Sequence, residues 1–471
     1  MDELWLAGFD FGSTTSRCVL ARGCPRRHPV TGRMELSDLQ VAYAPEPVFT
    51  PFDGDSLDAV ALGALLDQWI GEWGVAPSDL AGGGAIVTGL AARAANAEVV
   101  ARLVRGRFGN ALVATADDPA LEAWLAFMGN AARLSRAKPD RTFVNLDIGG
   151  GTTNFATGQA GQVQGAGCYY VGARHLRFLP GTYILAGASP FGARLLAQGG
   201  LARAPGEALT PSELDRVLNF YVGTLEAVVR GNGEVLAGDL AASHRQLALQ
   251  VPPPAESVIT LSGGVGELAY RCHRGDVLPP TTAYGDLGID LARRIADSPL
   301  LSRDLASDVP DEQGRATVCG MAMHNTEVSG ASLFLPRPDL LPLSAMPIVG
   351  RLRGNSTDDD ISALLTLAGA GAHPACLTVD SLADDPAAVA SFGGRLASAL
   401  ETRGFPPDRP LVLLAAGNSG KTLGYYATRW GRLSVPLIVL DEIAPRDARF
   451  ASLGRLRGHV VAVGFHGMNL T

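Results

Sequence analysis

Two short segments of the chain combine one acidic residue, glycines and small hydroxyl side chains in the same order. The first is GFDFGSTT at residues 8–15, and the second is LDIGGGTT at residues 146–153. Each begins as an apolar strand that carries one Asp, turns at glycine and continues after Ser or Thr. Glycines let a turn approach an anion closely and point backbone N–H groups at it. The two segments therefore predict phosphate binding.

The acidic residues of these segments are Asp10 and Asp147, and each stands just before its turn. A carboxylate in that place can hold the water ligands of a Mg²⁺ ion, which neutralises phosphate charge. One such hairpin alone is also compatible with an ordinary Gly-rich β-turn. Two copies in one chain favour two lobes that grip one triphosphate from opposite sides.

A third segment, ITLSGGVGE at residues 259–267, has the pattern of a strand that ends in paired glycines. Because Gly263 and Gly264 lack side chains, a flat base or sugar can lie against their backbone. Taken alone, the segment is also compatible with a plain strand-to-helix turn.

Stepping outward from these segments, apolar periodicity and turn residues predict the elements that position them. The predicted strands cover residues 4–11, 17–21, 83–88, 111–115, 142–148, 154–158 and 257–261, with a loop or hairpin insertion at 24–40. The predicted helices cover 56–73 with Ser56 as N-cap, 91–108, 119–134, 210–229 and 286–297, whereas 315–323 is expected to begin as a strand. Strands and helices then alternate over 361–370, 411–415, 421–430 and 437–440.

A chain of 471 residues exceeds what one hydrophobic core usually supports, so we expect several domains. The pattern predicts a first lobe with the first hairpin at 1–140. A second lobe at 141–330 carries the second hairpin and the paired glycines. A C-terminal α/β module is expected at 331–471.

Composition narrows the class of protein further. The formal net charge of −8 disfavours a general nucleic-acid binder. The six cysteines form no CxxC pair and suit neither a zinc site nor a disulfide framework. The N-terminus lacks the pattern of a signal peptide, and no apolar run reaches the roughly 18 to 20 residues of a membrane span. We therefore expect a cytoplasmic protein, with association with a bacterial microcompartment and homo-oligomer formation left open.

In this order and spacing, the three segments resemble those of the sugar kinase, Hsp70 and actin ATPases. Residues 8–15 resemble the phosphate-1 motif, 146–153 the phosphate-2 motif and 259–267 the adenosine motif. Residues 119–134 and 318–322 stand where the two connecting helices would lie. The resemblance implies an α/β, two-lobed actin/Hsp70/sugar-kinase-like (ribonuclease H-like) ATPase fold with a C-terminal α/β extension, and ATP and Mg²⁺ as its ligands.

Within that superfamily, the chain most resembles the reactivating factor of ethanolamine ammonia-lyase. The stretches that carry this resemblance are GFDFGSTTS at 8–16, FTP at 49–51, AIVTG at 85–89, VNLDIGGGTTNFA at 144–156, ITLSGGVGE at 259–267, GKTLGYY at 420–426 and VVAVGF at 460–465. The resemblance implies an ATPase with ethanolamine ammonia-lyase as its partner. Such a factor releases damaged cobalamin from the inactivated lyase, so that adenosylcobalamin can rebind. The open alternatives are a reactivase of a diol dehydratase, a small-molecule kinase, and a scaffold that holds ATP without useful turnover.

The resemblance also implies roles for single residues. Asp10 and Asp147 would organise Mg²⁺ and the attacking water, and Glu122 would orient that water or else be a solvated helix residue. The residues expected to contact the nucleotide are Gly12, Ser13, Thr14, Thr15, Gly149, Gly150, Gly151, Thr152, Thr153, Gly263, Gly264, Val265 and Glu267.

The tail departs from the expected pattern at AAGNSGKT, residues 415–422. This segment resembles the end of a P-loop, but Ala415 stands where the first glycine belongs. We interpret it as a strand-to-helix turn with Lys421 in the first helical turn, rather than as a second nucleotide site.

Overall fold

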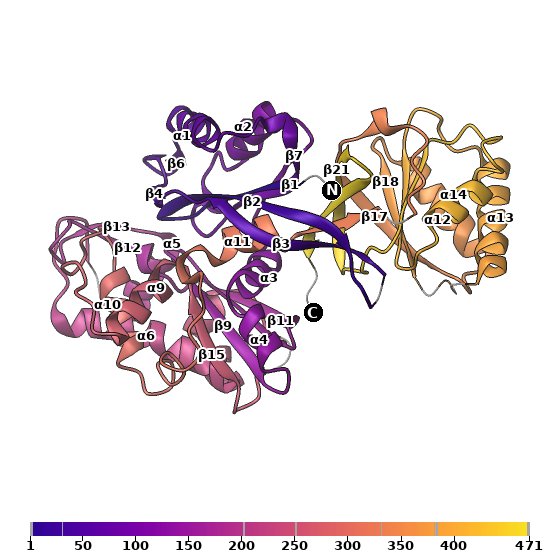
Figure 1. Ribbon diagram of the computed structural model, residues 1–471. Coiled ribbons are helices and arrows are strands. Elements are labelled where there is room, and N and C mark those ends of the chain that lie inside the picture. The colour runs from indigo at the N-terminus through magenta and orange to yellow at the C-terminus, as the bar shows by residue number, and fades with distance from the viewer. Residues whose placement is uncertain are drawn as a thin grey trace.

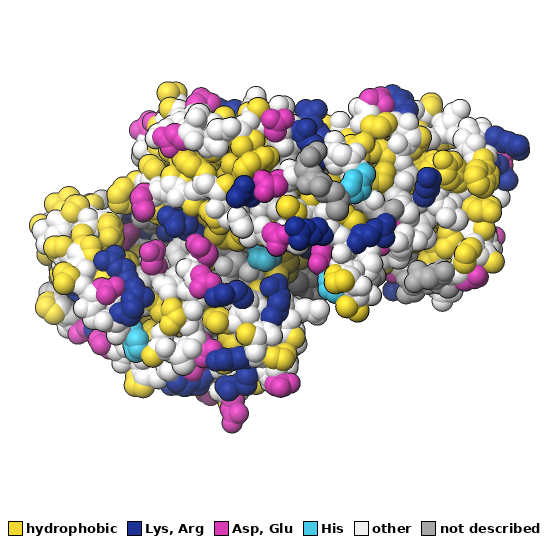
Figure 2. Space-filling view, in the orientation of Figure 1, with side chains coloured by type: hydrophobic (Ala, Val, Ile, Leu, Met, Phe, Trp, Pro, Cys, Tyr) yellow, Lys and Arg dark blue, Asp and Glu magenta, His cyan; other side chains and the backbone are white. Residues whose placement is uncertain are grey.

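The computed structural model describes residues 3–30, 32–200, 203–249, 252–330, 332–380, 382 and 385–468. Figure 1 shows three groups of elements: a first lobe, a second lobe below it, and a C-terminal module beside the first lobe. Figure 2 shows acidic and basic side chains interspersed over the visible face of the two lobes. No helix in these described ranges is long and apolar enough to cross a membrane.

The first lobe is built on a six-stranded sheet with the order β3-β2-β1-β7-β8, to which β4 is added beside β2. The strands β1 and β2 are antiparallel, and β1 is parallel to β7. Two helices, α1 and α2, cover this sheet, and their apolar faces share one core with Phe9 and Phe11 of β1. The elements are β1 Leu4–Phe11, β2 Thr15–Arg27, β3 Met34–Tyr43, β4 Val48–Phe49, β5 Phe52–Asp53, β6 Ser56–Leu57, α1 Ala59–Glu72, β7 Leu80–Val87, α2 Glu98–Phe108 and β8 Val113–Ala116.

The second lobe repeats this plan with the sheet order β14-β11-β10-β9-β15. The strand β9 is antiparallel to β10 and parallel to β15, as β1 is to β2 and β7. The two-lobed α/β architecture predicted from the sequence is thereby confirmed. The elements are β9 Thr142–Ile148, β10 Thr153–Gln159, β11 Gln162–Tyr169, β12 Leu176–Phe178, β13 Leu185–Ala188, α5 Pro190–Gln198, α6 Pro211–Arg230, α7 Gly233–Ala237, α8 Asp239–Ser243, β14 Arg245–Leu247, β15 Val258–Ser262, α9 Gly263–His273 and α10 Gly288–Ala296.

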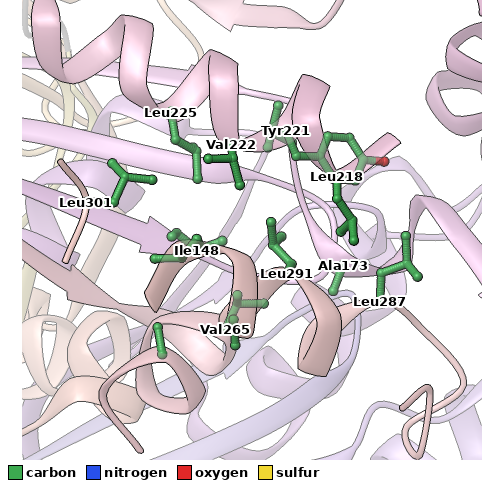
Figure 3. Packing of buried hydrophobic residues seen from close by; sticks show 14 of the residues in the cluster. Ile148, Ala173, Leu218, Tyr221, Val222, Leu225, Val265, Leu287, Leu291 and Leu301 are labelled. Carbon is green, nitrogen blue, oxygen red and sulfur yellow. The ribbon is translucent and has the colours of Figure 1, made fainter. Parts of the chain in front are cut away.

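The core of the second lobe lies directly behind its hairpin. Figure 3 shows Ile148, at the end of β9, packed among residues of α6, α9 and α10 such as Leu225, Val265 and Leu291. Thr210 opens α6 through a capping box with Glu213, which satisfies backbone N–H groups that the helix itself leaves free. This packing fixes the end of β9, from which the second turn begins.

Two helices lie between the lobes in Figure 1: α3 Pro119–Asn130, which α4 Ala132–Ala137 follows, and α11 Ala316–Met323. They cross at small residues. A Cβ atom on Gly129 would lie 2.0 Å from the Ala316 carbonyl oxygen, and one on Gly320 would lie 2.1 Å from that of Leu125. The expectation that 315–323 begins as a strand is wrong. This apolar run forms a buried helix, and because it is apolar on nearly every side, its sequence shows no helical periodicity.

The C-terminal module has a seven-stranded sheet with the order β16-β22-β21-β17-β18-β19-β20. It contacts the first lobe closely, since a Cβ atom on Gly454 would lie 2.0 Å from the Ala81 carbonyl oxygen. It also contacts α3, where the Gly467 N–H donates to Asp118 at 2.7 Å. The elements are β16 Thr326–Ser329, β17 Leu343–Arg353, α12 Asp358–Ala370, β18 Ala375–Asp380, α13 Pro386–Arg403, β19 Leu411–Ala415, α14 Gly420–Ala427, β20 Leu437–Leu440, β21 Ala448–Arg457 and β22 Val460–Met468.

Several element boundaries differ from the sequence prediction. The first helix begins after Asp58, whose carboxylate accepts from two backbone N–H groups, so Ser56 is not its N-cap. The predicted helix at 91–108 is regular only from Glu98. The predicted limits of the lobes at residues 140 and 330 stay a prediction. The structure places β16, which begins at Thr326, in the sheet of the C-terminal module.

Candidate active site

The first turn joins β1 to β2 and is closed by a bond from the Gly12 N–H to the Thr15 carbonyl at 3.0 Å. Thr50 holds it from behind. The Thr50 hydroxyl donates to the Gly12 carbonyl at 2.7 Å, and the Thr50 N–H donates to the Thr14 carbonyl at 2.9 Å. The Thr14 hydroxyl oxygen is buried without a hydrogen-bond partner among the described residues. An unsatisfied hydroxyl at this place suits a polar ligand.

The second turn joins β9 to β10 and has the same closing bond, from the Gly149 N–H to the Thr152 carbonyl at 2.9 Å. It lies against the first turn. A Cβ atom on Gly150 would lie 2.2 Å from the Thr14 hydroxyl oxygen, and one on Gly151 would lie 2.5 Å from that of Ser13. Glycine is required here because the two turns touch. A phosphate that binds between them would therefore need the turns to separate.

A cavity of about 350 Å³ opens between the lobes at these turns, within the range typical of small-molecule sites. The predicted site residues that line it are Asp10, Gly12, Ser13, Thr14, Thr15, Glu122, Asp147, Gly149, Gly150, Gly151, Thr152, Gly263, Gly264, Val265 and Glu267. Thr153 is not among them, because it is buried and its hydroxyl donates to the Val171 carbonyl at 2.8 Å. The structure therefore brings together in one cavity residues from the three motif segments and Glu122 from a fourth segment.

The second aspartate, Asp147, is fixed by two hydroxyl groups. Ser262 donates to one carboxylate oxygen at 2.7 Å, and Thr317 donates to the other at 3.3 Å. Burial raises the pKa of Asp147, and both of these hydrogen bonds and the Arg17 guanidinium act to lower it. The carboxylate is thus held in one orientation while it keeps contact with the cavity.

The first aspartate, Asp10, has one such support, the Thr88 hydroxyl at 3.1 Å. Burial raises the pKa of Asp10 to about 7, against the opposing effect of Arg17 and with a further contribution from Asp147. Near neutral pH this carboxyl is therefore divided between its two protonation states.

Glu122 lies on α3 and is buried, with 8% of its surface exposed, so it is not a solvated helix residue. Burial raises the pKa of Glu122 well above its usual range, and the Asp10 and Asp147 carboxyls raise it further. Three acidic groups this close disfavour each other's ionisation. A cation or a cation-bound nucleotide would relieve this cost, because it supplies the missing positive charge.

Mg²⁺ is the metal ion that the fold implies, and the residues present fit it in one particular way. Among the described side chains, no group of three or more His, Cys, Asp or Glu is arranged to hold a metal. Mg²⁺ usually keeps several water ligands and takes few from the protein, the rest coming from substrate phosphates. Asp10 and Asp147 suit this mode, in which they would bind the waters of the ion.

The other end of the cavity is formed by α9 and the loop before α10. Gly263 has a positive φ of 78°, and a Cβ atom there would lie 2.5 Å from the Ile148 carbonyl oxygen, so only glycine fits. Phe49 of the first lobe and Tyr284 of the second both line the cavity, with ring centroids 6.4 Å apart. These two rings offer aromatic surface at this end of the cavity, which suits a base.

Arg17 is the main cavity residue that the sequence analysis missed. It lies directly opposite Asp10 in the pairing of β1 with β2, and its charge lowers the pKa of both aspartates. Opposite residues of an antiparallel pair point to the same face, so the hairpin register alone was a signal for it. Thr50, Thr88 and Thr317 gave no such signal, because tertiary contacts alone bring them to the site.

The segment 415–422, which resembles the end of a P-loop, forms the turn between β19 and α14, as interpreted from the sequence. It lies in the C-terminal module and does not line the cavity between the lobes.

Comparison with known sequences places this chain among proteins of ethanolamine metabolism. The family model described as ethanolamine utilisation protein EutA matches residues 2–468. The chain belongs to the EutA family. It is 30% identical over 467 residues to the ethanolamine ammonia-lyase reactivase EutA of Salmonella typhimurium, covering 96% of this chain and 95% of that protein. It is 28% identical to the protein of the same name from Escherichia coli, with the same coverage of each chain.

Among solved structures, the EutA-family chain matches the ethanolamine utilization protein EutJ from Carboxydothermus hydrogenoformans at 15% identity and a TM-score of 0.30. That match covers 69% of this chain and 90% of the other. Its global similarity is too low to carry an argument about function. The family assignment therefore rests on the sequence matches, which include both hairpins and the C-terminal module.

Proposed function

We propose that this chain is an ATP-dependent reactivase of ethanolamine ammonia-lyase, which hydrolyses ATP and releases damaged cobalamin from the inactivated lyase so that adenosylcobalamin can rebind. The observation that carries the proposal is the 30% identity to a reactivase of that name over 96% of the chain. The cavity between the lobes supports it, because the cavity combines two Gly-rich turns with buried carboxylates at its floor.

In this proposal the two turns bind the phosphates of ATP. Among the described residues, no hydrogen bond engages the backbone N–H groups of Gly150, Gly151 and Thr152, so these donors are free for phosphate oxygens. The hydroxyl groups of Ser13 and Thr14 lie across from them. Positioning and charge neutralisation account for most of the catalysis in phosphoryl transfer.

The carboxylates would act on the attacking water and on the Mg²⁺ ion, which supplies positive charge to the phosphates when it is bound. Asp147 keeps its orientation through Ser262 and Thr317, which suits it to hold a water molecule in a fixed place. Glu122, whose pKa is raised by burial, would orient the attacking water by hydrogen bonding. The paired glycines and Glu267 would lie beside the adenosine, with Val265 behind them.

Coupling to the lyase would pass through the connecting helices. Because α3 and α11 cross closely at Gly129 and Gly320, a change of lobe angle would tilt one helix against the other. The C-terminal module is bonded to α3 through Asp118, and the Arg446 guanidinium lies 4.7 Å from the Trp124 ring centroid on the same helix. A change in nucleotide state would therefore also move this module, and different lobe angles would have different affinities for the lyase.

A reactivation assay tests the proposal. Ethanolamine ammonia-lyase stalled on cyanocobalamin is incubated with the protein, ATP, Mg²⁺ and free adenosylcobalamin, and ethanolamine turnover is followed. We expect activity to return with the wild-type protein and ATP, and to stay absent with Asp147→Asn or with a non-hydrolysable ATP analogue.

No rescue by the wild-type protein, or equal rescue without ATP, would contradict the proposal. Parallel assays with an inactivated diol dehydratase, and with sugars or polyols as phosphate acceptors, would then distinguish a different target from a small-molecule kinase. Association with a microcompartment and oligomer formation are separate predictions, which co-purification and sedimentation of the native protein would test.

A further inference from the structure

The second turn is held from behind by three successive residues that follow β11. The Ala173 N–H donates to the Gly149 carbonyl at 3.2 Å, and the Arg174 N–H donates to the Gly150 carbonyl at 2.6 Å. The next carbonyl, that of Gly151, faces the imidazole ring of His175. In a trans peptide the C=O and N–H groups point in opposite directions. Carbonyls held on the lobe side therefore leave the following N–H groups directed at the cavity.

The imidazole of His175 is fully buried, and its surroundings define its tautomer. Nδ1 lies 2.8 Å from the Ser189 hydroxyl oxygen. That oxygen already accepts from the Gly192 N–H at the start of α5, at 3.1 Å. A carbonyl oxygen can only accept a hydrogen bond, so the Gly151 carbonyl favours the tautomer with the proton on Nε2, in which Nδ1 accepts from the Ser189 hydroxyl. Burial lowers the pKa of His175 to about 4, so the ring is neutral at physiological pH.

Nε2 of His175 is buried and completes no hydrogen bond among the described residues. The backbone of Gly151 nevertheless acts on this ring as an acceptor and raises the pKa of His175. A buried donor facing a carbonyl without a completed bond is unfavourable, and a small shift of the turn would correct it. A phosphate between the two turns would need them to separate, and this movement would allow such a shift.

We propose that His175 is a positioning residue of the nucleotide site: its Nε2–H holds the Gly151 carbonyl and thereby aims the Thr152 N–H at a phosphate oxygen of the bound nucleotide. The hydrogen bond is completed when a phosphate-bearing nucleotide enters. This inference rests on the proposed ATP site, but on neither the identity of the partner nor the rate of hydrolysis.

A second buried histidine offers a matched control. His244 is also fully buried, and its Nδ1 lies 2.8 Å from the Leu240 carbonyl oxygen. Its ring packs against Phe191 and Phe220, and among the described residues its side chain makes no hydrogen bond to the turn at 149–152. Substitution of His244 removes a buried imidazole from the same lobe and leaves the carbonyls of the second turn supported.

The test compares Mg²⁺–ADP with adenosine, because only ADP carries phosphates. Dissociation constants are measured by calorimetry for the wild type, His175→Gln, His175→Asn and His244→Gln, with thermal melts to verify folding. The Gln amide nitrogen replaces Nε2, whereas the Asn amide reaches only as far as Nδ1. We expect His175→Asn to weaken ADP binding roughly tenfold with adenosine binding unchanged, which corresponds to one lost hydrogen bond of the stronger, charge-assisted kind. His175→Gln and His244→Gln should bind ADP within about twofold of the wild type, well below the effect of losing such a bond.

Equal weakening of ADP and adenosine, or wild-type ADP affinity in His175→Asn, would overturn the inference. A measurement on the wild type alone covers the case in which the variants fold poorly. With ¹⁵N-labelled histidine, the Nε2 resonance of His175 should show the protonated form and should shift on addition of Mg²⁺–ADP but not of adenosine. If wild-type protein binds neither ADP nor ATP, the proposed function itself fails; if it binds ADP without this shift, only the role of His175 fails.

Discussion

The two Gly-rich hairpins have nearly the same backbone but are supported in different ways. The closing bonds differ by only 0.1 Å, at 3.0 Å for Gly12 and 2.9 Å for Gly149. Behind the first turn stand separate residues: Thr50, which binds it through its hydroxyl and its N–H, and Leu90, whose N–H donates to the Ser13 hydroxyl at 2.6 Å. Behind the second turn stands the continuous segment 173–175, which is anchored in the core of the second lobe.

The difference extends to the aspartates. Asp147 accepts hydrogen bonds from two buried hydroxyl groups, whereas Asp10 accepts one, from Thr88. We therefore expect the second hairpin to be the more rigid half of the site, and the first hairpin to be the half that moves further when a nucleotide enters. Similar sequence motifs therefore do not imply equal roles, because the surrounding contacts decide how far each one can move.

The largest effect is expected from removal of either carboxylate charge. Asp147→Asn and Asp10→Asn should each lower kcat for ATP hydrolysis roughly 10²- to 10⁴-fold, because each removes a charge that positions water or metal. Steady-state hydrolysis by the purified proteins measures this. Asp286→Asn is the matched control: Asp286 lines the same cavity but pairs with Arg174 at 3.7 Å. A kcat loss in the control as large as in the other two would show that any buried acid in the cavity has this effect.

A second prediction probes the rigidity of the second hairpin. Gly263→Ala places a methyl group against the Ile148 carbonyl at a positive φ, which should destabilise the protein by about 1–3 kcal/mol and weaken nucleotide binding. At the neighbouring position, a Cβ atom of Gly264→Ala would meet only the Arg17 side chain, at 3.9 Å. Denaturant unfolding should therefore find Gly264→Ala close to the wild type. Equal stability of the two variants would show that the end of β9 can move to accommodate the added methyl group, contrary to what its packing indicates.

A third prediction concerns the support of the first hairpin. Thr50→Val removes the hydroxyl that bonds the Gly12 carbonyl, and we expect a rise in KM for ATP of roughly fivefold, equivalent to about 1 kcal/mol for one hydrogen bond. Thr50→Ser keeps the hydroxyl and should behave like the wild type. Measurement of kcat and KM for the three proteins separates a binding effect from a loss of catalysis. An unchanged KM in Thr50→Val would show that the Thr50 hydroxyl does not contribute to ATP binding and that the Thr50 backbone N–H supports the turn sufficiently.

The adjustable half of the site should also respond to pH. The pKa of Asp10 is raised to about 7, so this carboxyl is protonated below that pH and charged above it. If the charged form is active, kcat/KM for ATP should rise between about pH 6 and pH 8, and this rise should be absent in Asp10→Asn. A profile that is flat for the wild type over this range would contradict the assigned role of Asp10.

The raised pKa of Asp10 also affects folding stability. Stability should fall as the pH rises, whereas kcat/KM should increase. Because the folded pKa of about 7 lies above the ordinary value of 3.8, the folded protein holds a proton that the unfolded chain releases. The resulting stabilisation is complete below the ordinary pKa and is lost as the pH rises through the folded pKa. Asp10→Asn should therefore gain in thermal midpoint relative to the wild type at about pH 8, and gain least at about pH 5, where both side chains are neutral when folded.

The sequence was sufficient to predict the repeated hairpins, the paired glycines and most of the strands that carry them. These features are local, since a turn that must approach an anion needs glycine in the chain itself. The supports behind them were not predictable, because Thr50, Thr317 and His175 reach the site through tertiary packing. The burial of Glu122 was missed for the same reason, because tertiary packing against α11, β10 and β11 removes α3 from solvent. Periodicity missed the helix at 316–323, because an element that is apolar on every side has no amphipathic period, and only the family resemblance placed a connecting helix at 318–322.

The smallest effect is expected where the two halves of the site meet outside the turns. Arg93 of the first lobe donates to the Tyr170 hydroxyl of the second at 3.0 Å, and the Tyr170 ring stacks on Phe191 with centroids 3.8 Å apart. Tyr170→Phe removes the hydroxyl and keeps the stacking, so it weakens lobe closure without changing either hairpin. Because this hydrogen bond is partly solvated, its loss should accelerate ADP release only about threefold and leave kcat/KM for ATP nearly unchanged. Stopped-flow fluorescence measures the release rate. Phe191→Leu, which keeps the bond and loses the stacking, serves as the comparison. If it accelerates release more than Tyr170→Phe does, ring packing rather than the hydrogen bond holds the rigid and adjustable halves together.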